Sequence, residues 1–99
     1  LTKENLRQII DLLLKDIHAK LAEKDAKLVV TDEAKELILE KGYDKRYGAR
    51  PLKRAIQKLL EDKLSILSLT GQITSGCVIT ADRKDNEITL TAVSNLLEN

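Results

Sequence analysis

A chain of 99 residues with 42% hydrophobic and 33% charged residues has the size and apolar content of one domain with a real core. Its 17 basic and 16 acidic residues leave a net charge of +1, which argues against a general nucleic-acid or membrane-surface binder, because such proteins depend on a strong positive field. No stretch approaches the roughly 18 apolar residues of a membrane-spanning helix. The single cysteine excludes an internal disulfide and fits a reducing compartment, either the cytoplasm or an organelle stroma or matrix.

The first predicted element is a long amphipathic helix. Thr2 is a suitable N-cap, and the helical pattern continues to about Glu23. On its polar side we expect Asp11 to pair with Lys15, four residues later. Apolar residues recur at steps of three and four along the other face: Leu6, Ile9, Ile10, Leu13, Leu14, Ile17 and Leu21.

A short strand and a second helix are predicted next. Residues 27–30 form a β-branched run, which indicates a strand. Thr31 then caps a helix whose inward face includes Leu37. Gly42 follows Lys41 and is interpreted as the glycine just beyond the helix, where a left-handed backbone ends it.

The third predicted helix begins at Pro51, because proline is well suited to the first helical position. Serines in its second half lower helix propensity, so we expect a break near Ser65, which would create a fourth helix, and an end at Gly71. Its buried residues are expected to be Leu52, Ala55, Ile56, Leu59, Leu60 and Leu64.

From Gly76 onward the apolar period changes to two, which predicts a β-hairpin with its turn at residues 82–86. Two strands alone are marginally stable, so the strand at 27–30 is expected to join them in a three-stranded sheet. Residues 93–99 are expected to form a last turn or a frayed tail. The fold class is therefore α+β, with three helices, or four if the third is broken, and a small sheet that ends in a hairpin.

The candidate site is the stretch Gly48-Ala49-Arg50-Pro51. Gly48 permits a turn or a close approach that a side chain would block. Proline after Arg50 holds the arginine at a helix entrance, where free N–H groups and the helix dipole favour an anion. Because the planar guanidinium matches phosphate oxygens, we expect Arg50 to read a nucleotide phosphate, supported by its neighbours in this stretch.

Other polar residues near this stretch admit two interpretations. Lys53 and Arg54 could contact phosphate or a neighbouring subunit, although a solvated helix face is the more ordinary role. Tyr43 and Tyr47 could pack on adenine or on a partner domain, although tyrosines more often close the edge of an aliphatic core.

No catalytic or metal site is predicted. His18 has no second ligand at metal-binding spacing, and Cys77 has no neighbour that would stabilise a thiolate. The sequence contains no phosphate loop and no hydrophobic strand ending in an acidic pair, so we expect this chain alone not to hydrolyse ATP.

Residues 42–57 read GYDKRYGARPLKRAIQ, and this stretch resembles one family. It is similar to the C-terminal small, or lid, subdomain of the second AAA+ module in Clp-type unfoldases, the ClpB disaggregase and ClpC groups. The order of elements agrees along the whole chain, although family members often have proline where Lys45 stands. Because the chain begins at Leu1 beside a capping signal, we expect residues 1–99 to be one small subdomain cut from a larger chain.

The resemblance implies a role in an ATP-dependent, hexameric, protein-unfolding machine. It implies that Arg50 belongs to the second sensor motif and reaches the γ-phosphate of ATP on the large subdomain of the same chain, which would also hold Mg²⁺. It further implies contacts with neighbouring subunits of the ring, and unfolded protein clients handled by the parent protein.

Two alternatives remain open from the residues alone. One is a free-standing module for protein interaction, which would dock a partner on the sheet or the first helix. The other is a weak nucleic-acid-binding module, against which the near-neutral charge and the lack of an aromatic platform both argue. The basic residues available to it are Lys45, Arg46, Arg50, Lys53, Arg54 and Lys58.

Overall fold

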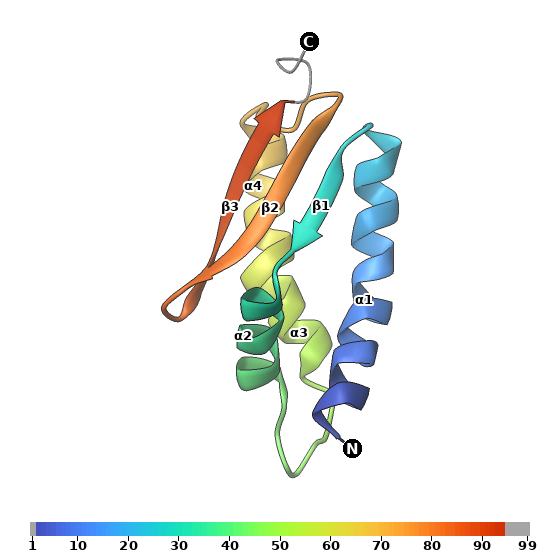
Figure 1. Cartoon of the computed structure of the whole chain (residues 1–99), viewed down its shortest axis with the longest axis vertical. Coiled ribbons are helices and arrows are strands. Elements are labelled where there is room, and N and C mark those ends of the chain that lie inside the picture. Colours follow the sequence, from blue (N-terminus) through green and yellow to red (C-terminus); the bar gives the residue numbers. More distant parts are fainter. Residues whose placement is uncertain (1, 95–99) are drawn as a thin grey trace.

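The computed structural model of the chain describes residues 2–94. The elements are α1 (Lys3–Glu23), β1 (Lys27–Val30), α2 (Asp32–Gly42), α3 (Leu52–Ile56), η1 (Gln57–Glu61), α4 (Asp62–Leu69), β2 (Cys77–Lys84) and β3 (Glu87–Ser94). They form an elongated molecule of 48 × 23 × 22 Å, in which α1 runs alongside β1, α4 lies behind the sheet, and α3 lies beyond the end of β1, between α2 and α1 (Figure 1). The predicted α+β class is confirmed.

Helix α1 begins and ends at local signals. The Thr2 hydroxyl accepts the N–H of Asn5 at 3.0 Å, and the Asn5 side chain accepts the N–H of Thr2 at 3.3 Å, which is a reciprocal capping box. At the other end Asp25 has a φ of 56°, and the N–H of Ala26 donates to the carbonyl of Leu21 at 2.9 Å. This bonding satisfies the last carbonyls of the helix.

The predicted apolar face of α1 is confirmed, whereas the predicted ion pair is wrong. Lys35 of α2 approaches Asp11 at 2.8 Å, so Asp11 joins two helices and does not bond to Lys15 within its own helix. Five positions of the stripe are buried and two, Ile9 and Leu13, are half-buried against the core; the buried ones are Leu6, Ile10, Leu14, Ile17 and Leu21.

The third helical segment is continuous from Leu52 to Leu69. The predicted break near Ser65 is absent, because α4 passes through that residue. The irregularity lies earlier, in the π-helical turns of η1, and no fourth separate helix forms. The predicted end is correct: Gly71 has a φ of 75°, and the N–H of Gln72 donates to the carbonyl of Leu67 at 2.9 Å.

The predicted three-stranded sheet is confirmed. Its strand order is β1-β2-β3, with β1 parallel to β2 and β2 antiparallel to β3. The predicted turn at residues 82–86 is too long, because the strands pair as far as Lys84 and Glu87. Only Asp85 and Asn86 connect them, with Asp85 at a φ of 58°. Val93 and Ser94 belong to β3, and the rest of the expected tail lies outside the described residues.

Gly42 is needed for packing and does not supply the predicted left-handed helix end. It is the last residue of α2, and a Cβ built on it would lie 2.8 Å from Leu52 Cδ2, 2.9 Å from Leu52 Cα and 3.0 Å from Ala55 Cβ. The side-chain-free surface of Gly42 therefore lets α2 and α3 approach closely.

The core is aliphatic and continuous between the helices and the inner face of the sheet. Leu59 is predicted to be buried on the third helix, but it is only half-buried. The largest fully buried side chains are Ile10, Leu14, Leu37, Ile38, Leu52, Ile56, Leu60, Ile79 and Ile88. No helix within residues 2–94 is long and apolar enough to cross a membrane.

Candidate functional site

The loop between α2 and α3 carries the candidate site. It lies at the same end of the molecule as the beginning of α1, away from the ends of β2 and β3 that adjoin residues 77 and 94 (Figure 1). Residues 44–58 hold one acidic side chain, Asp44, against six basic ones in a chain whose net charge is only +1. This end of the domain is therefore locally positive and suited to an anion.

Asp44 organises the loop, a role that the sequence analysis missed. Its carbonyl accepts the N–H of Tyr47 at 3.2 Å and the N–H of Gly48 at 2.6 Å, and its own N–H donates to Gly48 at 3.3 Å. Its carboxylate accepts the N–H of Arg46 at 2.7 Å. An aspartate two residues before the amide that it binds is a known turn signal, so this role could have been predicted from the sequence.

The supporting residues each have an identifiable structural role. Gly48 has a φ of 65° with open space around it, so it is needed for its backbone conformation and not for a close approach. Ala49 packs half-buried against the core. Pro51 is the N-cap, so the helix begins at Leu52, one residue later than predicted, and the Pro51 carbonyl accepts the N–H of Ala55 at 3.0 Å.

Arg50 lies between these anchored residues with an exposed side chain. Its backbone is held, because its N–H donates to the carbonyl of Tyr47 at 3.3 Å. Its guanidinium forms no hydrogen bond or ion pair within residues 2–94, whereas Arg7 and Arg83 bond to carboxylates at 3.3 and 2.5 Å. The site thus presents a fixed backbone with a guanidinium that is available for an external anion.

Lys53 and Arg54 are both exposed but face different hollows. Lys53 lines a hollow against α1 with Asp16 and Lys20. Arg54 lines another with Lys41 and Lys58, beside Pro51. The structure therefore separates these two predicted secondary contacts, as expected for successive residues on a helix, about 100° apart.

The two tyrosines do not close the core as expected. Tyr43 is 40% exposed and Tyr47 is 58% exposed. The guanidinium carbon of Arg46 lies 5.4 Å from the Tyr47 ring centroid, which is a cation–π distance. Both rings therefore belong to the surface of the candidate site.

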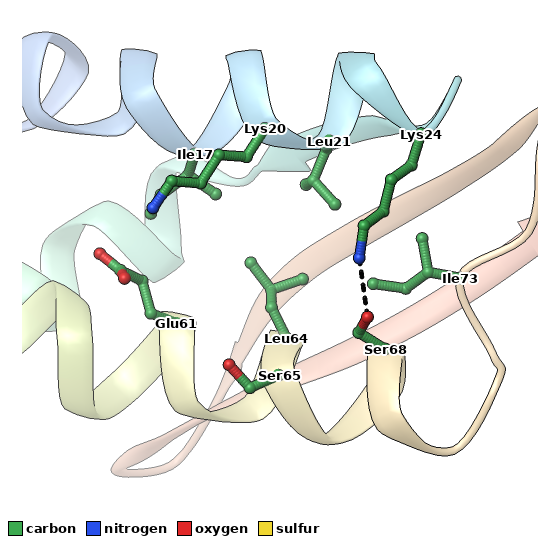
Figure 2. Close-up of a pocket in the computed structure, with 9 residues that line it drawn as sticks. All are labelled: Ile17, Lys20, Leu21, Lys24, Glu61, Leu64, Ser65, Ser68 and Ile73. Atoms are coloured by element: carbon green, nitrogen blue, oxygen red, sulfur yellow. Dashed lines mark hydrogen bonds between the residues drawn. The ribbon is translucent and has the colours of Figure 1, made fainter.

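A third hollow, of about 200 Å³, lies between α1 and α4 (Figure 2). Its floor includes Leu21 and Leu64, and Lys24 Nζ donates to Ser68 Oγ across it at 2.8 Å. None of the residues that line this hollow is a histidine. The hydrogen bond between Lys24 and Ser68 connects the end of α1 to α4, which is a structural role.

No grouping of three or more histidine, cysteine or acidic side chains that could hold a metal occurs among residues 2–94. Cys77 is buried, and His18 is exposed on α1.

Ion pairs on α2 connect it to other elements. Hydrogen bonding from Arg83 holds the pKa of the Glu40 carboxyl below its usual value, and the same bond raises the pKa of Arg83. The Lys3 ammonium, at 2.7 Å, is the main cause that lowers the pKa of Glu36, with a further contribution from Arg7. These pairs hold α1 and the hairpin to α2 near the candidate loop.

Comparison with known proteins identifies the family. Residues 1–81 match the family described as "C-terminal, D2-small domain, of ClpB protein". The chain belongs to the ClpB D2-small family. The expected family is thereby confirmed, and the D2-small match extends over the candidate loop and the helix that follows it.

Relatives of this D2-small domain include proteins named "ATP-dependent Clp protease ATP-binding subunit ClpC". Those of Staphylococcus aureus strains USA300 and NCTC 8325 are 46% identical over 87 residues, and that of Staphylococcus epidermidis ATCC 12228 is 47% identical over 87 residues. Each match covers 88% of this chain and 11% of the relative. The D2-small domain therefore corresponds to about a ninth of those proteins.

Proposed function

We propose that this domain is the lid of an AAA+ ATPase module in a Clp-type chaperone and that Arg50 senses the γ-phosphate of ATP. The observation that carries the proposal is a guanidinium without a partner inside residues 2–94, on a backbone held by hydrogen bonds at both sides. Membership of the ClpB D2-small family and the name of the ClpC relatives, which are ATP-binding subunits, support it.

The chain offers one wall of such a nucleotide site. Arg50 would contact terminal phosphate oxygens, and the exposed Lys45 and Arg46 of the same loop add positive potential nearby. ATP and its Mg²⁺ would be bound mainly by the large subdomain of the same parent chain, of which residues 1–99 would be the small part. The domain alone would not turn over ATP.

The proposed sensing acts by shifting a hinge between subdomains. A charged hydrogen bond contributes about 1.5–3 kcal/mol, which is enough to bias two arrangements roughly ten- to hundredfold. Gaining the bond with ATP and losing it after hydrolysis would swing the lid. Contacts between the lid and the next subunit would then pass the movement around a hexameric ring and drive the threading of unfolded protein.

The test uses the full-length ATPase that contains this domain, with Arg50→Ala and, as the matched control, Arg54→Ala. Both arginines are exposed and have no ion pair within residues 2–94, so the two variants lose the same charge. We expect Arg50→Ala to lower ATP turnover or its coupling to unfolding at least tenfold, while Arg54→Ala changes it less than threefold. Equal effects, or normal activity of Arg50→Ala, would contradict the assignment.

A second test uses the 99-residue chain itself. Because it supplies one wall of the site, we expect ATP to bind with a Kd no tighter than about 1 mM, equivalent to about −4 kcal/mol. Submicromolar binding, measured by titration calorimetry, would mean that this chain holds a complete nucleotide site, which the proposal does not allow.

A further inference from the structure

Among residues 2–94, strand β3 pairs with β2 alone, so its other side is a free edge of the sheet. Its two-residue turn makes Lys84 and Glu87 a hydrogen-bonded pair, so every second residue from Ile88 directs its backbone N–H and C=O away from β2. The contact with α4 agrees with this, since the Lys63 ammonium donates to the outward carbonyl of Ile88.

The next two outward positions are open. The outward N–H and C=O groups of Leu90 and Ala92 have no partner within residues 2–94. Natural edge strands are usually protected by a charge, a proline or a bulge. Between Ile88 and Val93 the strand has none of these, because its residues are uncharged and its pairing with β2 runs without interruption.

An apolar hollow of about 350 Å³ runs beside this edge, between β3 and α4. It is lined by Lys63, Ile66, Leu67, Ile88, Thr89 and Leu90. Ile66 is 59% exposed, and Leu69 farther along α4 is 87% exposed. A strand added to β3 would place every second side chain in this hollow, because alternate residues of a strand share a face.

The geometry points to β3 and this hollow as a site that binds an extended polypeptide segment by strand addition. Its ligand has large aliphatic side chains facing α4 and an acidic residue at its C-terminal end, and it runs antiparallel to β3. A polypeptide is required because its backbone supplies donors and acceptors at the spacing of Leu90 and Ala92.

Charge complementarity selects the acidic end. The half-buried Lys63 has no carboxylate partner within residues 2–94 and lies where an antiparallel segment would end. A second copy of β3 fits less well. In an antiparallel arrangement the end of its uncharged stretch 88–94 would lie beside Lys63, and its Glu87 would lie at the opposite end of the pair. This inference does not depend on the role of Arg50, which lies in a different loop.

The experiment titrates the ¹⁵N-labelled 99-residue chain with the peptide acetyl-Thr-Leu-Thr-Leu-Thr-Asp. We expect saturable NMR shifts along β3 and α4, and slower hydrogen exchange at the amides of Leu90 and Ala92. A peptide N-methylated at its leucines keeps the side chains but cannot donate to the edge, and should bind at least tenfold more weakly.

Variants locate the site. Ala92→Pro removes an outward N–H without removing a bond to β2, and should weaken binding at least tenfold. Ile66→Ala should weaken it severalfold, whereas Leu12→Ala, on a side chain of similar exposure (62%) on α1, should not. Lys63→Gln should lower affinity for the Asp peptide and leave affinity for an Asn version unchanged. Far-UV circular dichroism confirms that each variant is folded.

Three results would overturn the inference: no saturable shifts up to the solubility limit, shifts that map to residues away from β3 and α4, or equal binding of the N-methylated peptide. Concentration-dependent dimerisation that Ala92→Pro abolishes, without peptide binding, would assign the edge to a second copy instead and would also overturn it. Loss of ATP coupling in Arg50→Ala has no bearing on these outcomes.

Discussion

Gly42→Ala tests the close contact between α2 and α3. The added Cβ would lie under 3.0 Å from the backbone Cα of Leu52, whose side chain is fully buried and has no free direction in which to move. Forcing an extra methyl into such packing costs about 1–3 kcal/mol. Alanine recovers up to about 1 kcal/mol of helix propensity relative to glycine, which offsets part of the loss.

The expected net effect is a destabilisation of about 1–2 kcal/mol, which corresponds to a fall in Tm of roughly 4–16 °C for a domain of this size. Thermal and urea unfolding followed by circular dichroism measure it. Lys41→Ala, on the exposed neighbouring residue, is the control and should change Tm little. A Gly42→Ala variant as stable as the parent would show that the two helices can separate freely, which would refute the packing argument.

Three further predictions concern the loop and the ion pairs. Gly48→Ala should destabilise the chain by about 1–2 kcal/mol in urea unfolding, because its left-handed backbone strains any side chain even though space is open. Asp44→Ala should leave Tm nearly unchanged yet speed hydrogen exchange at the Arg46 amide, since that amide loses its acceptor. The pKa of Glu40 is lowered in the fold, so its pairing with Arg83 stabilises the folded state at pH values above 4.5, the ordinary pKa of a glutamate, and this stabilisation is lost as the pH falls below 4.5. Glu40→Gln should therefore lose less stability on acidification than the parent chain. Urea unfolding midpoints measured against pH test this.

Local patterns explain why much of the fold was predictable. The three- and four-residue spacing of apolar side chains gave α1 its face, and threonine caps gave α1 and α2 their beginnings at Lys3 and Asp32. These signals lie within a few residues of the feature that they determine. For the same reason β1 and the hairpin could be predicted, together with the end of α4 before Gly71.

The sequence-based predictions fail where a residue is constrained by contacts with a distant part of the chain. Gly42 was interpreted as a local helix end, but its constraint comes from Leu52, ten residues later. Asp11 has a suitable partner in Lys15, four residues away, but it forms its ion pair with Lys35 of α2. The π-helical turns of η1 have no local composition that marks them, so the irregularity was expected near Ser65 instead.

For the candidate site, the sequence predicted the position of Arg50 at a helix entrance but not its freedom from internal partners. That freedom depends on where every carboxylate of the fold comes to lie, and Asp44 binds Arg46 while Glu36 and Glu40 bind Arg7 and Arg83. Helix geometry alone separates Lys53 from Arg54, but the hollow that each of them lines depends on how α3 packs against its neighbours.

The unbroken helical segment from Leu52 to Leu69 gives the domain a lever arm. Its 18 residues extend for about 27 Å, starting directly after the Arg50 turn and ending beside the sheet. A tilt of about 5° at the Pro51 end would displace the Leu69 end by about 2.4 Å over that length. Small adjustments of the turn would thus be magnified at the opposite pole of the molecule, where the leucine at position 69 is 87% exposed.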